Sequence, residues 1–234
     1  MSNDVAERGT SSFVDDEFDP SVWDEIKPYV DELLSRKISC SKCIEGIIRD
    51  ASELSEHISE KGALLYIAMT CDTESDEKRS SFLDFVENIR PKLSEFSDSL
   101  NRRLVEHEAV DNLPARYDLM IRSMKNDIDI FRKENIPLGV EQTKLVTESQ
   151  TINGAMTVEF DGNEYTLPEM RRYLESNDRS IREGAWKAVV NRRMQDEDRL
   201  SEIFDELVSL RHKIARNAGF ETYTDYMFRA MERF

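Results

Sequence analysis

Apolar residues recur every three or four positions along most of this chain. A period near 3.6 places such residues on one face of a helix, whereas a half-buried strand alternates every second residue. The pattern therefore limits most of the chain to amphipathic helices packed through their apolar faces, and it predicts a mainly α fold. The clearest run follows Cys43, and its apolar members are Ile44, Ile47, Ile48, Ala51, Leu54 and Ile58.

Proline, glycine and capping residues set the expected helix boundaries. Asp19 followed by Pro20 is a typical helix start, and Gly62 is expected to separate two helices. Pro28 and Pro91 are expected to kink the helices that contain them. The expected helical segments are 19–34, 43–61, 63–71, 75–107, 114 to the Ile-Pro-Leu-Gly sequence at 136–139, 140–152, 166–174, 178–190, 200 to Gly219, and 222–234.

The periodicity changes at residues 156–166. Apolar and polar residues alternate there on both sides of Asp161-Gly162. An Asp-Gly pair between alternating segments is the typical signal of a two-residue hairpin, because both turn residues must adopt positive φ. We therefore expect one β-hairpin at about 156–166 within the helical chain.

Three segments are expected along the chain. Residues 1–18 are rich in Ser, Asp and Glu and poor in apolar groups, which predicts a disordered acidic tail. An N-terminal helical domain is expected over 19–153, and the hairpin with its following helices over 154–234. The helix over 222–234 ends without a cap, Gly, Pro or polar tail, so we expect it to belong to a truncated domain.

The net charge excludes two classes of partner. The chain has 32 Lys and Arg against 48 Asp and Glu, a formal net charge of −16. Binding to phosphate backbones or anionic lipids requires clustered basic residues, so no nucleic acid and no membrane partner is expected. No uncharged stretch exceeds ten residues, and the first nineteen residues hold no apolar run typical of a secretory signal. A soluble, cytoplasmic protein is expected.

The three cysteines favour a reducing compartment over a disulfide framework, because one of Cys40, Cys43 and Cys71 must stay unpaired in a monomer. Cys40 and Cys43 form a single Cys-x-x-Cys motif. No second pair of ligands has the spacing of a zinc site. A structural or incidental role is favoured for these cysteines, with redox chemistry and metal binding as the alternatives.

Catalytic motifs are missing from the sequence. Two histidines at i and i+4 around a glutamate would face one metal ion, but after His107 and Glu108 the position of the second histidine is held by Asp111. This segment is interpreted as a solvated helix end. Glycine patterns of phosphate-binding loops and the Gly-x-Ser-x-Gly nucleophile motif are also absent.

The two other histidines also have simpler interpretations than metal binding. His57 lies among Glu53, Glu56 and Glu60 on a charged helix surface. His212 follows Arg211 near a helix end, where packing or a salt bridge is the favoured role. No catalytic, cofactor-binding or metal-binding residue is therefore assigned, and no metal is expected to be bound by this chain.

A series of short motifs nevertheless resembles the oligoendopeptidase F family of zinc metallopeptidases, which is akin to thimet oligopeptidase. The resemblance covers about residues 20–234 and rests on the order and spacing of the motifs. They are residues 66–73 (YIAMTCDT), 131–137 (FRKENIP), 154–162 (GAMTVEFDG), 165–168 (YTLP), 178–186 (DRSIREGAW), 210–215 (LRHKIA), 217–220 (NAGF) and 223–230 (YTDYMFRA).

The resemblance implies a mostly helical, zincin-type oligopeptidase that cleaves short peptides inside a cavity walled by helices. In that family, zinc is held by the two histidines of a His-Glu-x-x-His helix and a later glutamate, and this sequence contains none of these residues. Family members are more than twice as long as this chain. The catalytic helix is therefore expected beyond Phe234.

Two hypotheses follow. In the first, the chain is the N-terminal part of a zinc-dependent oligoendopeptidase, is inactive alone, and packs against a C-terminal catalytic region through an apolar face exposed over 200–234. Its substrates would be oligopeptides. In the second, the chain is a non-catalytic helical module that binds a peptide or a protein.

Overall fold

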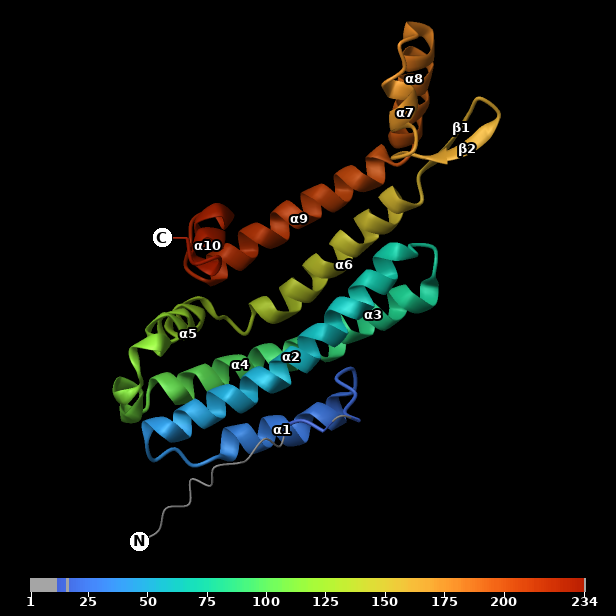
Figure 1. Cartoon of the computed structure of the whole chain (residues 1–234). Coiled ribbons are helices and arrows are strands. Elements are labelled where there is room, and N and C mark those ends of the chain that lie inside the picture. Colours follow the sequence, from blue (N-terminus) through green and yellow to red (C-terminus); the bar gives the residue numbers. More distant parts are fainter. Residues whose placement is uncertain (1–11, 16, 234) are drawn as a thin grey trace.

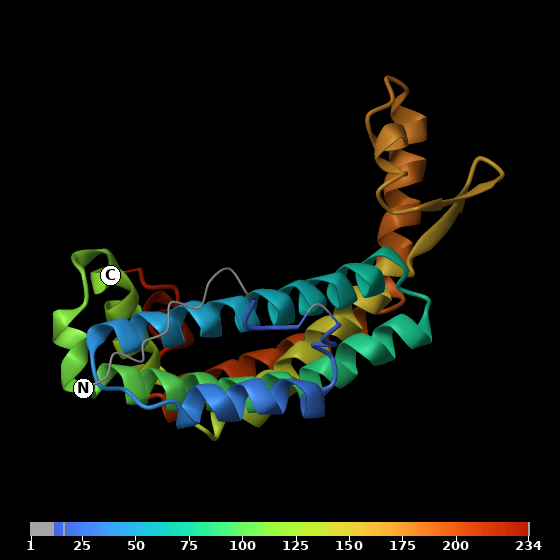
Figure 2. The ribbon, with the colours of Figure 1, turned by 60° about the horizontal axis from the view of Figure 1, so that its bottom comes forward.

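The computed structural model describes residues 12–15 and 17–233 and shows an elongated bundle of helices with a smaller lobe projecting from one end (Figures 1 and 2). Helices α1 to α4 pack together, α6 lies beside α3 and α4, and α9 lies beside α6. This confirms the mainly α fold. The helices are α1 (Trp23–Ser35), α2 (Ser41–Cys71), α3 (Asp76–Asn88), α4 (Arg90–Val105), α5 (Asp118–Ile130), α6 (Asn135–Gly154), α7 (Arg171–Leu174), α8 (Arg179–Met194), α9 (Glu197–Asn217) and α10 (Tyr223–Ala230), with 3-10 turns η1 (Glu108–Asn112) and η2 (Ala115–Tyr117).

The expected start of the first helix is wrong by several residues. Asp19 accepts hydrogen bonds from the backbone N–H and the hydroxyl of Ser21, at 2.9 and 2.7 Å, and these bonds close a separate turn before the helix. α1 then begins at Trp23. Pro28 lies inside α1, which continues to Ser35.

Gly62 does not separate two helices, because α2 runs unbroken from Ser41 to Cys71. A Cβ on Gly62 would lie 2.9 Å from Cε1 of Phe85, which is closer than side-chain carbons normally approach. The glycine therefore allows α3 to pack closely against α2. Its role is in packing, a function of tertiary contact that local sequence signals do not reveal.

Pro91 and Pro137 both lie in the first turn of a helix, where a missing N–H leaves no intrahelical bond unmade. The segment expected as one helix over 75–107 is therefore divided into α3 and α4 at Ile89. The sequence at 136–139 opens α6, which corrects the expectation that it ends a helix. The helix expected from Pro114 begins instead as the turn η2 and continues as α5.

The hairpin at 156–166 is confirmed. β1 (Thr157–Phe160) pairs antiparallel with β2 (Asn163–Thr166), and the turn residues Asp161 and Gly162 have φ of 51° and 76°. The hairpin packs with α7 and α8 around a small core of its own, formed by Val158, Met170 and Ala185. This lobe projects from the end of the bundle (Figure 2).

The expectation of a disordered tail is corrected for residues 12–15 and 17–18, while residues 1–11 and 16 lie outside the described residues. Val14 is only 1% exposed and belongs to the main core. The backbone N–H groups of Phe13 and Val14 donate to Oε1 of Glu53 in α2, at 2.7 and 3.0 Å. A few apolar side chains and hydrogen bonds to the distant Glu53 thus order a segment whose average composition is polar.

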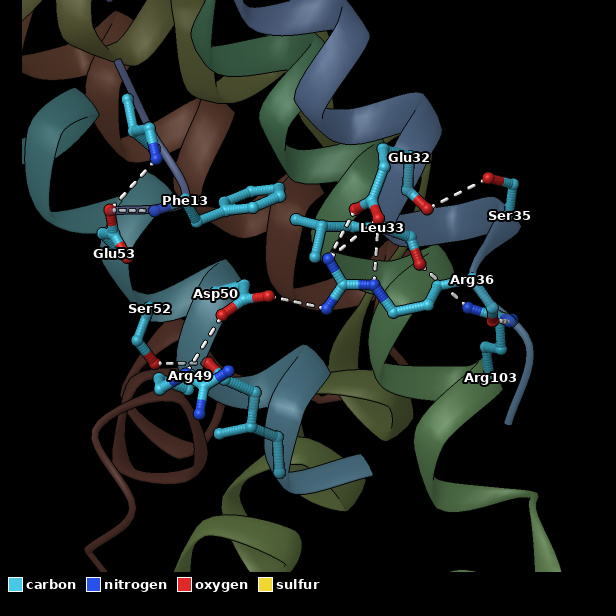
Figure 3. Close-up of polar contacts among 12 residues, drawn as sticks. Phe13, Glu32, Leu33, Ser35, Arg36, Arg49, Asp50, Ser52, Glu53 and Arg103 are labelled. Carbon is cyan, nitrogen blue, oxygen red and sulfur yellow. Dashed lines mark hydrogen bonds and ion pairs between the residues drawn. The ribbon is translucent and has the colours of Figure 1, made fainter. Parts of the chain in front are cut away.

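A buried ionic network joins α1, α2 and α4 (Figure 3). Asp50 of α2 is only 4% exposed, and its Oδ2 accepts from Nη1 of Arg36 at 2.7 Å. Arg36 also donates three bonds to Glu32 of α1, and Arg103 of α4 donates to the backbone carbonyls of Leu33 and Arg36. Buried charges need such partners, because an unpaired one would lose its hydration without compensation.

Candidate functional site

Helix α9 has one face buried against α6 and another face open. Ile203 and Leu207 are buried against Leu145 of α6. One residue further along the helix in each case, Phe204 is 63% exposed and Val208 is 42% exposed. Phe228 and Met231, in and just after α10, are also exposed. Phe204 and Val208, which lie one turn apart on α9, are called the open face below.

Polar contacts fix α9 along α6 at several points. Arg199 of α9 donates from Nε and Nη2 to the two carboxylate oxygens of Glu148 in α6, at 2.6 and 2.8 Å. The paired bonds hold the pKa of Glu148 below its ordinary value, because the guanidinium stabilises the charged carboxylate. At the other end of α9, Asn135 Nδ2 donates to the carbonyl of Ile214 at 3.0 Å. The orientation of the open face is thereby set.

A hollow of about 490 Å³ adjoins the open face where α6, α8 and α9 meet. Its apolar lining includes Met156, Met194 and Phe204. Charged side chains of both signs, Arg193 and Glu197 among them, lie at the same hollow. A partly apolar hollow with a few charged groups is suited to holding an apolar side chain of another segment rather than to bond-breaking chemistry.

A second cavity, of about 390 Å³, lies between α3, α4, α5, α6 and α10. Burial raises the pKa of Asp127 there, and the nearby charge of Glu232 raises it further. Burial raises the pKa of Tyr226 and lowers that of Arg90, which stacks on the rings of Phe82 and Phe85. Perturbed groups of this kind often mark functional sites.

The chemistry of this second cavity is limited by how its basic groups are used. Arg132 donates to the carbonyls of Asp129, Phe131 and Asn217, at 2.9, 2.6 and 3.0 Å, so its guanidinium serves to join α5 to the end of α9. The lining residues include neither a histidine nor a cysteine. The cavity offers a carboxyl and a phenol without a nucleophile and base in contact.

The three histidines lie on separate elements. His107 caps η1, where its Nδ1 accepts from the backbone N–H of Ala109 at 3.1 Å. The ring of His57 in α2 meets that of Phe18 edge to face, with centroids 6.3 Å apart. His212 lies on the exposed surface of α9.

The described residues do not fit the zinc that the family resemblance implies. Within residues 12–15 and 17–233, no group of three His, Cys, Asp or Glu side chains is arranged to hold a metal ion. Glu108 and Asp111 lie in the 3-10 turn η1 rather than on a helix that could present two ligands to one ion. No catalytic step is therefore derived through zinc from these residues.

The cysteines divide into a pair and a single residue. Sγ of Cys40 lies 3.0 Å from Sγ of Cys43, at the start of α2, and both residues are half-buried. Cys71 is exposed at the other end of the same helix. The Cys-x-x-Cys spacing in the sequence could indicate this proximity, because residues three apart are neighbours on a helix.

Neither the hollow beside α9 nor the burial of Asp50 in its ion pair with Arg36 was predicted from the sequence. By its spacing, Phe204 belongs to the same apolar stripe as Ile203 and Leu207. The available signal was the width of that stripe, since consecutive apolar residues such as Ile203 and Phe204 cannot both face one neighbouring helix.

Among the described residues, none of the helices combines the length and the apolar character that a membrane span requires.

Comparison with known proteins agrees with this architecture. The sequence profile of the peptidase M3 N-terminal domain matches residues 13–131. No curated protein matches the chain.

Solved structures share the fold over nearly all of the chain. A protein assigned as oligoendopeptidase F from Bacillus anthracis str. Ames superposes with a TM-score of 0.86 at 22% identity, over 95% of this chain and 41% of that one. PZ peptidase A, solved with an inhibitor, gives 0.86 at 20% identity, over 95% and 40%. Oligoendopeptidase F from Enterococcus faecium gives 0.66 at 13% identity, over 91% and 46%. The chain thus spans about two fifths of the length of the first two structures.

Proposed function

This chain belongs to the peptidase M3 N-terminal domain family, and from that premise we propose that it is the N-terminal part of a zinc-dependent metalloendopeptidase that hydrolyses short oligopeptides. Its helices would form one wall of the peptide cavity, and the zinc site would come from a C-terminal catalytic region outside residues 1–234. Residues 19–153 would be the helical domain. Residues 154–234 would begin the peptidase domain.

The observation that carries this proposal is the open face of α9, together with the exposed Phe228 and Met231. Large apolar side chains are normally covered when a helix can turn them toward a neighbour, and a contiguous exposed group of them indicates an interaction surface. Phe204 and Val208 lie one turn apart on the same side of α9, which is held rigidly along α6. The catalytic region is the proposed occupant of this surface.

The charge and the shape of the chain support an oligopeptide rather than a nucleic acid as substrate. The net charge of −16 repels phosphate backbones, whereas the helical bundle shares the fold of structures named as oligoendopeptidases and a peptidase. A cytoplasmic location is part of the proposal. It is supported by three free cysteines, which a reducing compartment preserves.

The direct test is peptide hydrolysis together with metal content. We expect purified chain to contain no stoichiometric zinc and to leave a quenched fluorescent oligopeptide uncut. The same residues produced together with a catalytic region bearing the His-Glu-x-x-His helix should cut the peptide and lose this activity with a chelator. Chelator-sensitive turnover by residues 1–234 alone would contradict the proposal. Inactivity of the combined protein, despite a loaded zinc site, would also contradict it.

A further inference from the structure

Cys40 and Cys43 form a close pair of thiols that the proposed function does not use. Cys40 is the residue immediately before α2 and has an extended backbone, with φ of −163° and ψ of 168°. Cys43 lies in the first turn, where its backbone N–H donates to the carbonyl of Cys40 at 3.0 Å. This turn brings Sγ of Cys40 to 3.0 Å from Sγ of Cys43.

The surroundings of Cys43 stabilise a thiolate. The thiol of Cys40 and the hydroxyl of Ser39, 3.4 Å away, can both donate to Sγ of Cys43. Hydrogen bonds from Cys40 and then from Ser39 lower the pKa of Cys43 to about 7. The first turn of a helix also favours negative charge, because its N–H groups lack intrahelical partners. About half of Cys43 would then be ionised at neutral pH.

We propose that Cys40 and Cys43 form a redox-active dithiol that exchanges with low-molecular-weight disulfides. In the first step, the Cys43 thiolate attacks one sulfur of the small disulfide, which forms a mixed disulfide and releases one small thiolate. In the second step, the Cys40 thiolate attacks Sγ of Cys43 and releases the second small thiolate. Two protein thiols are oxidised to a disulfide, the small disulfide is reduced to two thiols, and the protons of Cys40 and Cys43 pass to water or to the leaving thiolates.

The geometry assigns different roles to the two cysteines and to Cys71. Cys43 is the attacking group, because the neighbouring donors stabilise its thiolate. Cys40 is the resolving group, because its sulfur already lies beside that of Cys43. Cys71 is exposed at the opposite end of α2, about 45 Å away along a helix that rises about 1.5 Å per residue, so it has no resolving partner. It serves as an internal control for a single thiol.

The test is incubation of the reduced, folded chain with glutathione disulfide, followed by alkylation of remaining thiols and mass mapping of the cysteine peptides. We expect a Cys40–Cys43 disulfide with the loss of two hydrogens, and a stable glutathione adduct on Cys71. Two alkylated thiols at Cys40 and Cys43 under conditions that modify Cys71 would overturn the proposal. Separate glutathione adducts on both residues would overturn it as well.

Single variants distinguish the two roles. Cys40→Ser should trap glutathione on Cys43, because the resolving thiol is gone, and Cys43→Ser should slow capture at Cys40. In the unaltered reduced chain, the initial loss of alkylatable Cys43 to glutathione disulfide at pH 7 should be about threefold faster when the chain is folded than in urea. The Cys40 thiol is then present to stabilise the thiolate, and the greater thiolate fraction outweighs the lower nucleophilicity. Equal rates in the folded and unfolded chains would contradict the assignment of Cys43 as the attacking group. Circular dichroism confirms that each variant is folded, and a serine variant that is not folded is replaced by the alanine variant at the same position.

Discussion

Large apolar residues differ in burial between the helices before residue 154, called the first region below, and the helices α9 and α10, called the second region. In α1 to α4, large apolar residues such as Ile26, Leu33 and Leu104 are completely buried in one core. In α9 and α10, Phe204 and Phe228 are more than half exposed. The first region also exposes apolar residues, among them Leu64, Tyr66 and Ile67 of α2 and Leu119 of α5. In the proposed function, the first region is the helical domain and the second presents a surface for the catalytic region.

Polar residues show the same contrast. Asp50 is buried and paired across α1 and α2, so it joins elements within the first region. The ion pairs of Arg199 with Glu202 and Glu206 lie on the surface of α9 and are largely exposed, and only its bond to Glu148 joins α9 to another helix. Exposed pairs contribute little to stability. The second region is joined to α6 by the small apolar cluster around Leu145 and by the bonds of Arg199 and Asn135.

The largest effect is expected from Asp50→Ala. This substitution removes one of the two carboxylates that pair with Arg36 and leaves Glu32 as the other. We expect the free energy of unfolding to fall by about 3 kcal/mol. Urea denaturation measures the change. The matched control is Lys27→Ala, which breaks an exposed pair with Asp31 and should cost less than about 0.5 kcal/mol. Equal effects of the two substitutions would show that the first region is not held by its buried network.

A somewhat smaller loss is expected from Ile203→Ala, on the buried side of α9. Removing a buried isoleucine costs transfer free energy and leaves a cavity, which we expect to lower stability by about 2 kcal/mol because the cluster with α6 is small. Phe204→Ala, at the next position, should change stability by less than about 0.5 kcal/mol. Thermal unfolding of both variants tests whether the two faces of α9 differ. A larger loss for Phe204→Ala would reverse the assignment of the faces.

Gly62→Ala tests the close packing inside the first region. The added Cβ would lie 2.9 Å from the Phe85 ring, so we expect a loss of about 1 to 2 kcal/mol despite the better helix propensity of alanine. Gly46→Ala, in the same helix, meets nothing within 4 Å and should be stabilising by about 0.5 to 1 kcal/mol. Opposite signs in urea denaturation are the expected result. If both substitutions stabilise the chain, α2 and α3 are not closely packed.

Opposite pH dependences are expected from Glu53, inside the first region, and from Asp127 of α5, which lies at the cavity shared with α10. Burial tends to raise the pKa of Glu53, but bonds from Ser12, Val14 and Phe13 outweigh it and lower the pKa below 4.5. Its contribution to stability is therefore present above pH 4.5 and is lost as the pH falls through the lowered pKa.

Burial and the charge of Glu232 instead raise the pKa of Asp127 above 3.8, so its contribution is present below pH 3.8 and is lost as the pH rises through the raised pKa. Glu53→Gln should therefore reduce stability mainly at neutral pH, and Asp127→Asn should increase it there. Denaturation of both variants between pH 3 and pH 7 measures these small changes. If both variants gain stability at neutral pH, or both lose it, the opposite effects expected from Glu53 and Asp127 are contradicted.

Local signals in the sequence predicted the parts of the fold that depend on neighbouring residues. Asp161-Gly162 formed the expected turn, Asp178 accepts from the backbone N–H of Ser180 as the expected cap of α8, and Gly219 has the positive φ of a helix end. Pro137 was misjudged because a proline can open a helix as well as end one. The role of Gly62 was not predicted, because the glycine is required by the close approach of Phe85, which lies more than twenty residues away in the sequence.

The candidate site depends even more on distant partners. The burial of Asp50 requires Arg36, and the orientation of Phe204 depends on which side of α9 meets Leu145. The hydrophobic pattern indicated an apolar face over 200–234 but did not distinguish its covered side from its open side. The Cys40 and Cys43 pair could be found from spacing alone, whereas its shared hydrogen bonds could not.

Binding of a polarity-sensitive dye tests most directly whether α9 presents an uncovered apolar face. The dye is added to the chain and to a Phe204→Ser, Val208→Ser double variant, and sedimentation follows the self-association of both. We expect the unaltered chain to bind dye and the double variant to lose roughly half of the signal at unchanged stability. Leu119→Ser, at an equally exposed leucine in α5, should leave the signal unchanged. A monodisperse chain that binds no dye, or a signal lost only with Leu119→Ser, would contradict the claim that α9 presents an uncovered interaction face.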